Sequence, residues 1–205
     1  MVIIVKPTHL CNLRCKYCFI GDKRQENNIM SPTLAKSLVR KVKNYLKVSG
    51  RKSIKFIWHG GEPLLWGIEN FEKILKFCAT TLKDYKVRHS IQTNLTLIDK
   101  GFVDLFKLYD VSVGFSLDGD RQLNDITRVG IDGTGTFKLI EKKIELCRKN
   151  NLKIAAIVVL TEANKNHIKR IYEYFVANNL NFKLNPVFNF GSAEGCYDKI
   201  GISVD

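Results

Sequence analysis

The feature that most constrains the fold is an alternation of short apolar runs with longer amphipathic segments. Strands are expected at residues 2–5, 54–58, 87–92, 111–117, 152–160 and 182–188. Helices are expected at residues 32–48, 70–82, 99–108, 137–149 and 165–178. This order predicts parallel βαβ units, in either a doubly wound open sheet or a (β/α) barrel. Because a full barrel has eight units and typically ~250 residues, the 205 residues predict an α/β fold of the partial (β/α)6, TIM-like open-barrel type.

The chain shows no internal boundary. No linker, repeat or low-complexity segment interrupts residues 1–190, which are expected to form one core domain. Residues 191–205 have no clear element and are interpreted as a short tail that begins a further C-terminal region. No apolar run approaches the ~20 residues that span a bilayer, and the N-terminus does not resemble a signal peptide. A cytoplasmic protein without a membrane segment is therefore expected.

The chain is basic, with a formal net charge of +13. Such an excess can mark a nucleic-acid-binding protein. The lysines, however, are scattered over the polar positions of the expected helices and form no dense block. Solvated helix faces explain the charge better, and an RNA or acidic peptide partner remains an alternative.

Three of the six cysteines lie within eight residues, in the pattern C-x3-C-x2-C formed by Cys11, Cys15 and Cys18. In a reducing compartment this crowding indicates a metal site rather than disulfides. Three thiolates leave one iron of a [4Fe–4S] cluster without a protein ligand, and an open iron can bind a substrate. The alternative is a zinc site, which would need a fourth ligand such as His9.

The other cysteines have different surroundings. Cys78 and Cys147 fall within helical patterns and are expected to be core thiols, whereas Cys196 lies in the Gly-rich tail and has no assigned role.

Unusual residues follow the first four expected strands. The cysteine motif follows the first strand, His-Gly-Gly-Glu-Pro at 59–63 the second, Thr-Asn at 93–94 the third, and Ser-Leu-Asp-Gly at 116–119 the fourth. The C-terminal strand ends of such barrels carry the chemistry. These four segments are therefore expected to form one site.

These motifs resemble the radical S-adenosylmethionine (radical SAM) superfamily. An aromatic residue, Tyr17, precedes the last cysteine, and residues 58–65 resemble the Gly-Gly-Glu-Pro motif. Residues 90–99 and 113–119 are similar to the corresponding stretches of anaerobic sulfatase-maturating enzymes and related SPASM-type peptide maturases. The resemblance covers about residues 3–190.

The resemblance implies a cofactor pair and a reaction. A [4Fe–4S] cluster on the three cysteines would bind S-adenosyl-L-methionine and cleave it reductively to a 5′-deoxyadenosyl radical, which modifies a peptide or protein side chain. The partners implied are that substrate and an external one-electron reductant such as flavodoxin or ferredoxin.

The resemblance also implies six residues that contact S-adenosylmethionine: Gly60, Gly61, Glu62, Asn94, Ser116 and Arg128. The glycines would let the backbone approach the methionine amino group, and Glu62 would place negative charge near it. Ser116 and Arg128 would contact the ribose or carboxylate. A loop cap is the alternative role for Asn94, and a surface position is the alternative for Arg128.

Several further residues are less defined. Asp118 and Gly119 are interpreted as a turn, and His59 as either a substrate contact or a structural residue. The adenine-side candidates are Val158, Val159, Asn185 and Pro186. The alternative for Val158 and Val159 is the interior of a hydrophobic strand.

The sequence departs from the maturase pattern in two places. Leu95 replaces a glycine that relatives usually have, and the cysteine-rich auxiliary-cluster region is missing, together with the proposed general base. No catalytic base can be assigned. Three explanations of the missing region stay open: a fragment of a longer enzyme, a minimal radical enzyme whose substrate or partner covers the barrel mouth, and a truncated or degenerate, non-catalytic iron–sulfur binding protein. A separate alternative, suggested by the net charge of +13, is a radical enzyme that modifies RNA.

Overall fold

A computed structural model describes residues 1–21, 23 and 27–202. Its centre is one sheet of six parallel strands in the order β1-β2-β3-β4-β5-β6. The strands are β1 (Val2–Val5), β2 (Ser53–Trp58), β3 (Lys86–Thr93), β4 (Val111–Ser116), β5 (Ile154–Leu160) and β6 (Asn181–Pro186). A doubly wound sheet would reverse its strand order near the middle. The sequential order therefore confirms the open, partial barrel.

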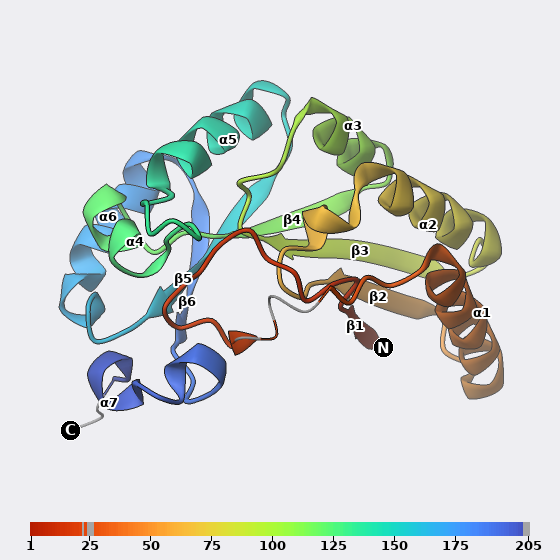
Figure 1. The fold of residues 1–205 in the computed structure, drawn as a ribbon. Helices are drawn as coiled ribbons and strands as arrows, with labels where there is room; N and C mark the ends of the chain where they lie inside the picture. Colours follow the sequence, from red (N-terminus) through yellow and green to blue (C-terminus); the bar gives the residue numbers. More distant parts are fainter. Residues whose placement is uncertain (22, 24–26, 203–205) are drawn as a thin grey trace.

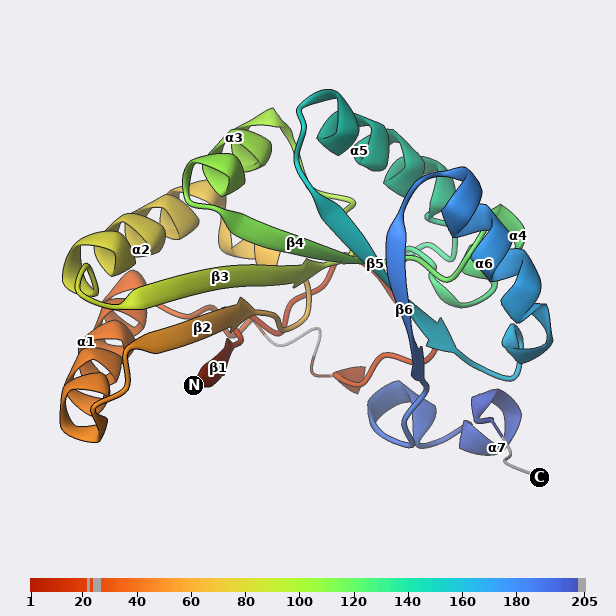
Figure 2. The same cartoon turned by 180° about the vertical axis from the view of Figure 1, so that it is seen from behind.

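Helices cover the outer face of the curved sheet (Figures 1 and 2). They are α1 (Pro32–Ser49), α2 (Ile68–Thr81), α3 (Lys100–Leu108), α5 (Phe137–Lys149) and α6 (Ile168–Ala177), all close to the predicted ranges. Local signals explain their ends. Ser31 caps α1 by accepting a hydrogen bond from the Leu34 N–H at 3.2 Å, and Gly50 ends it with a left-handed backbone.

The sequence patterns missed the short elements. These are helices α4 (Arg121–Thr127) and α7 (Tyr197–Ile200) and the 3-10 helices Pro63–Trp66 and Gly191–Ala193. The expectation that the tail lacks any element is therefore wrong. Elements this short do not establish a 3.6-residue period, and α4 buries the polar residues Asn124 and Thr127 instead of an apolar stripe. A further 3-10 helix, Lys165–His167, forms the start of the helix expected at residues 165–178.

Side chains along each strand alternate between two faces. On β4, Val113 and Phe115 are buried under the helices, whereas Ser116 faces the concave side and lines a cavity there. The core thus lies between sheet and helices, and it includes Cys78 and Cys147, which confirms the prediction for both. The concave face carries both polar side chains such as Ser116 and apolar ones such as Ile157 and Val159.

No helix in the described residues is long and apolar enough to cross a membrane.

Candidate functional site

The cysteine motif lies in the long loop between β1 and α1, which crosses the concave side of the sheet (Figure 1). Backbone hydrogen bonds fix this loop against residues 127–129. The Arg14 N–H donates to the Val129 carbonyl at 2.8 Å, and the Lys16 N–H donates to the Thr127 carbonyl at 2.9 Å. The loop therefore has a defined conformation supported by the segment after α4.

Cys11, Cys15 and Cys18 all line one cavity of about 530 Å³ on the concave side. Burial raises the pKa of Cys11 to about 12 and also raises that of Cys15. Both thiols are thus neutral by themselves, and binding of a cationic metal group would displace their protons. The cavity therefore holds three thiols that a bound metal group would convert to thiolates.

No three His, Cys, Asp or Glu side chains of the described residues converge closely enough to hold one metal ion. Tetrahedral zinc needs four ligands, each within about 2.0–2.3 Å of the ion. The choice of a cluster over a zinc ion at these three cysteines therefore stays a prediction.

The glycine turn after β2 packs directly against the segment that leads into Cys11. A Cβ on Gly60 would lie 2.3 Å from the Thr8 carbonyl oxygen, and a Cβ on Gly61 would lie 2.2 Å from the carbonyl oxygens of His9 and Leu10. Gly60 also has a φ of +125°, which favours glycine. Both glycines line the cavity, and their predicted contact with the cofactor remains a prediction.

Glu62 lies beneath this turn, is completely buried, and is not among the residues that line the cavity. One carboxylate oxygen accepts hydrogen bonds from the Thr93 hydroxyl (2.7 Å) and the Leu64 N–H (2.9 Å). The other accepts one from the Asn94 N–H at 2.7 Å. Glu62 thus joins the ends of β2 and β3, and this positioning role is what the structure shows. Its predicted proximity to the methionine ammonium remains a prediction.

Burial raises the pKa of Glu62 from 4.5 to about 7, although its three hydrogen bonds lower it. A carboxyl group with a raised pKa in the folded state makes the fold lose stability as the pH rises from about 4.5 through 7, by up to about 3 kcal/mol. Urea unfolding of the metal-free protein at pH 5 and pH 8 should show this loss. Glu62→Gln should flatten the dependence, and the exposed control Glu69→Gln should leave it unchanged. Identical pH profiles for all three proteins would contradict the prediction.

Asn94 serves as a loop cap and also faces the cysteine motif. Its side-chain oxygen accepts a hydrogen bond from the Thr96 N–H at 3.0 Å. Its amide nitrogen lies 2.9 Å from the Asn12 oxygen and 3.8 Å from the Cys11 sulfur. Hydrogen bonds to a ligating sulfur tune an iron–sulfur cluster. The structure thus shows the cap and places the amide beside Cys11.

Leu95, which stands where a glycine is expected, has a left-handed backbone conformation. Its φ is +68° and its side chain is completely buried in the core. The left-handed backbone costs about 1–2 kcal/mol for a residue with a Cβ, and burial of the leucine side chain offsets this cost. The chain therefore accommodates a leucine at this left-handed position.

Ser116 lines the cavity at the end of β4 and pairs with a residue that the sequence patterns did not identify. The Gln92 amide nitrogen donates to the Ser116 hydroxyl at 3.1 Å, and Gln92 lines the same cavity. Its position could have been found from the alternation of faces, because Gln92 precedes Asn94 by two residues on neighbouring β3.

Arg128 is buried, with 5% of its surface exposed, which rules out the surface-arginine alternative. Its guanidinium lines the cavity and donates to the Tyr17 hydroxyl at 2.7 Å. Its Nε has no hydrogen-bond partner in the described part of the chain. Burial alone would lower the pKa of Arg128, but the anionic forms of Cys15, Tyr17 and Asp118 raise it. The guanidinium is therefore a permanent buried cation whose Nε donor is without a hydrogen-bond partner in the described part of the chain.

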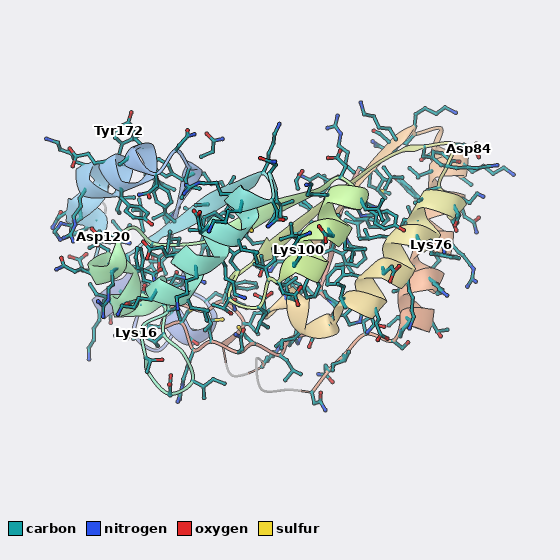
Figure 3. All side chains as sticks on the ribbon, turned by 90° about the horizontal axis from the view of Figure 1, so that it is seen from above. Lys16, Lys76, Asp84, Lys100, Asp120 and Tyr172 are labelled. Carbon is teal, nitrogen blue, oxygen red and sulfur yellow. The ribbon has the colours of Figure 1, made fainter. Side chains whose placement is uncertain are left out.

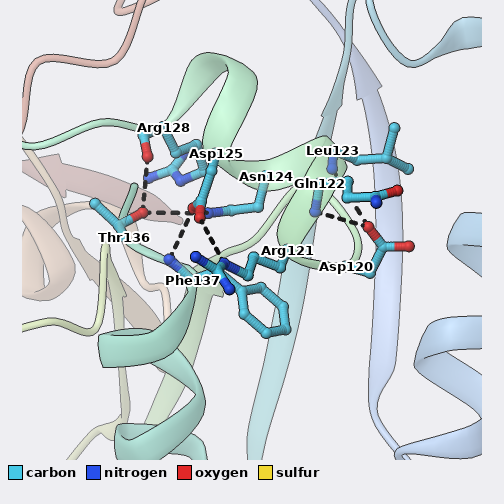
Figure 4. A network of polar contacts seen from close by, with 9 residues as sticks. All are labelled: Asp120, Arg121, Gln122, Leu123, Asn124, Asp125, Arg128, Thr136 and Phe137. Carbon is cyan, nitrogen blue, oxygen red and sulfur yellow. Dashed lines mark hydrogen bonds and ion pairs between the residues drawn. The ribbon is translucent and has the colours of Figure 1, made fainter. Parts of the chain in front are cut away.

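The backbone of Arg128 is fixed by α4 (Figure 4). Asp120 caps this helix by accepting a hydrogen bond from the Gln122 N–H at 3.0 Å. At the other end the Arg128 N–H donates to the Asn124 carbonyl at 2.9 Å, and the Arg128 carbonyl accepts from the Thr136 hydroxyl at 2.9 Å. A helix missed in the sequence thus positions a predicted site residue.

Asp118 is more than the turn residue expected. It is completely buried and accepts hydrogen bonds from the Tyr17 hydroxyl (2.5 Å) and the Thr127 hydroxyl (2.9 Å) on one oxygen. The other oxygen accepts from the Val159 N–H at 3.0 Å. Asp118 therefore ties the cysteine loop to the ends of β4 and β5.

The adenine-side candidates divide between the two faces of the sheet. Val158 is completely buried in the core under the helices, so its predicted place beside the cofactor is wrong. Val159, Asn185 and Pro186 do line the cavity. His59 lines it as well, and its Nδ1 accepts a hydrogen bond from the Gly60 N–H at 2.7 Å.

Comparison with known proteins places this site in a family. The sequence pattern of the Radical SAM superfamily matches residues 5–175. The cysteine-type anaerobic sulfatase-maturating enzyme of Clostridium perfringens is 32% identical over 187 residues, which cover 88% of this chain and 50% of that protein. The serine-type enzyme of Klebsiella aerogenes is 29% identical over 196 residues, covering 93% of this chain and 48% of that protein. The chain thus spans about half the length of these relatives.

Solved structures of a protein with the same fold support this family assignment. Native anSMEcpe with bound AdoMet has a TM-score of 0.83 and 29% identity, covering 91% of this chain and 52% of that one. The same native protein with bound AdoMet and the Kp18Cys peptide has a TM-score of 0.84, again with 29% identity, covering 91% of this chain and 51% of that one. Enzymes of the matched family use a [4Fe–4S] cluster and S-adenosylmethionine, the two cofactors expected from the motifs. Fold, motifs and sequence similarity together show that this chain belongs to the radical SAM superfamily.

Proposed function

We propose that this chain binds a [4Fe–4S] cluster on Cys11, Cys15 and Cys18 and S-adenosylmethionine in the adjoining cavity, as a radical enzyme that acts on a peptide or protein side chain. The observation that carries the proposal is a shared cavity. It holds the three thiols and a buried, charged guanidinium whose Nε has no hydrogen-bond partner among the described residues. When bound and reduced, the cluster supplies the electron that cleaves S-adenosylmethionine to methionine and a 5′-deoxyadenosyl radical.

The residues around the cavity fit the parts of S-adenosylmethionine. The cationic Arg128 suits its carboxylate, because a guanidinium forms paired, charge-assisted hydrogen bonds with such a group. Ser116 and Gln92 offer hydroxyl and amide groups to the ribose. Gly60 and Gly61 leave the backbone open to the amino group, since no Cβ intrudes.

A peptide or protein substrate is supported by the relatives. The similar enzymes are named for maturing sulfatases, and one solved relative carries a peptide together with AdoMet. The cavity is bordered by two exposed aromatic residues, Phe188 and Phe190, which are 69% and 62% exposed. An apolar rim of this kind suits contact with a polypeptide.

The division of the chain at residue 190 is also a proposal. Residues 191–193 pack back onto the cysteine loop, where the Ser192 N–H donates to the Cys18 carbonyl at 2.8 Å. We propose that residues 1–190 form the radical SAM core and that residues 191–205 lead into a C-terminal region. A cytoplasmic location belongs to the same proposal.

The decisive experiment is anaerobic reconstitution with iron and sulfide, followed by reduction with dithionite and addition of S-adenosylmethionine. We expect 5′-deoxyadenosine and methionine in equal amounts. Arg128→Gln should bind S-adenosylmethionine at least about 10-fold more weakly, because a charged hydrogen bond contributes about 1.5–3 kcal/mol. The surface control Arg121→Gln should bind normally. A cluster-loaded wild-type protein that yields no 5′-deoxyadenosine would refute the proposed activity.

A further inference from the structure

A second hollow, a groove of about 1270 Å³, lies against the cysteine loop. Its walls are the cysteine loop and the segment from Phe190 to Ile200. Cys15 lines both this groove and the cavity of about 530 Å³ that holds the three thiols, which is called the cofactor cavity below. The groove therefore reaches one proposed cluster ligand, Cys15, from outside the cofactor cavity.

The charges of this basic groove have one predominant sign. Among its described lining residues, Glu194 is the single carboxylate, and the basic side chains are Lys6, Arg14, Lys16, Lys23 and Lys199. Arg14, Lys16 and Lys199 are exposed and form no ion pair in the described part of the chain. An uncompensated cluster of exposed cations attracts an anionic partner.

The loop geometry places two of these charges beside Cys15. Within the cysteine loop, Leu13 and Tyr17 line the cofactor cavity, whereas Arg14 and Lys16 line the basic groove. The backbone N–H groups of Arg14 and Lys16 are both hydrogen-bonded to residues 127–129, at 2.8 and 2.9 Å. The two cations are thus presented on a fixed backbone on either side of a proposed cluster ligand.

We propose that the basic groove docks an acidic protein that carries one electron, so that its redox group stands over Cys15. The inference rests on the proposed function. The carrier loses one electron and is oxidised, the cluster charge falls by one, and no bond forms or breaks. Position favours a donor over a substrate. A substrate must reach the cavity that holds S-adenosylmethionine, whereas a donor needs only to approach the cluster from outside.

The test uses an acidic flavodoxin as the probe and the full chain with its cluster assembled. Arg14→Glu/Lys16→Glu reverses both loop charges. The control, Lys76→Glu/Lys83→Glu, makes the same charge change at exposed positions in and just beyond α2; Figure 3 shows Lys76 at the other end of the molecule from Lys16. Two quantities are measured at low and high salt, namely binding of oxidised flavodoxin and the rate at which reduced flavodoxin reduces the cluster.

We expect the Arg14→Glu/Lys16→Glu protein to lose at least about 10-fold in binding and in reduction rate at low salt, with the difference fading as salt screens the charges. Reduction and turnover with dithionite should be unchanged, since this small reductant needs no docking surface. Equal rates for wild type and the loop variant, or an equal loss in the α2 control, would overturn the docking site. So would tighter binding of an RNA oligonucleotide that the loop variant abolishes. Failure to assemble a cluster, measured beforehand as iron content, would instead refute the proposed function.

Discussion

Replacing Cys15 by alanine should abolish cluster assembly and leave a folded protein. The three thiols of the motif are the only cysteines among the described residues that line the cofactor cavity, so two remaining ligands cannot hold a cluster that normally has three. The fold should survive because the loop is held through the backbone at Arg14 and Lys16 rather than through the Cys15 side chain. Iron and sulfide content after reconstitution should fall to background, and formation of 5′-deoxyadenosine should stop.

The matched control is Cys196→Ala. Cys196 is also a half-buried free thiol, but it lies in the basic groove outside the cofactor cavity. The Cys196→Ala protein should keep its iron, its visible absorption and its turnover. The circular dichroism of both variants should match that of the wild type. Full iron content in the Cys15→Ala protein would show that the ligand assignment is wrong.

Gly61→Ala should disrupt the same site through the backbone. The added methyl group would lie 2.2 Å from two carbonyl oxygens, and backbone atoms cannot move aside like the end of a flexible side chain. Residues 9–10 would have to shift, and Cys11 with them. Overpacking of this kind costs about 3 kcal/mol, and the shift should also reduce iron loading severalfold. Urea unfolding of the metal-free protein and iron analysis after reconstitution measure the two effects separately.

Gly195→Ala is the comparison for this change, because its added methyl group meets no atom within 4 Å. Its unfolding midpoint and iron content should match the wild type. An unchanged midpoint in Gly61→Ala would mean that the turn and the cysteine loop are not in the close contact described above.

Two kinds of feature could be predicted from the sequence: elements with a periodic pattern of apolar residues, and residues that stand at the ends of strands. The alternation of strands and helices was enough to predict an open parallel barrel, because each element has its own period. The strand ends identified most of the site, since Cys11, Gly61, Asn94 and Ser116 each follow or end a strand and all line one cavity.

The parts that were missed depend on contacts between distant residues. Asp118 looks like a turn residue locally, and its burial depends on Tyr17, which lies 101 residues earlier. The burial of Arg128 depends likewise on α4, a helix too short and too polar to show a period. Val158 and Val159 are chemically identical neighbours, so only the register of β5 decides which one faces the cavity.

The packing of residues 191–193 onto the cysteine loop has a consequence for biosynthesis. Cys18 leaves the ribosome early, but its carbonyl partner Ser192 and the packing partner Ala193 of the adjacent Tyr17 follow about 175 residues later. At ~5–20 residues per second, translation leaves the cysteine loop without this cover for roughly 10–35 s. During this interval the three thiols are open to an iron–sulfur delivery system and equally to oxidants. Cluster insertion during synthesis would therefore meet a more accessible loop than insertion into the finished fold.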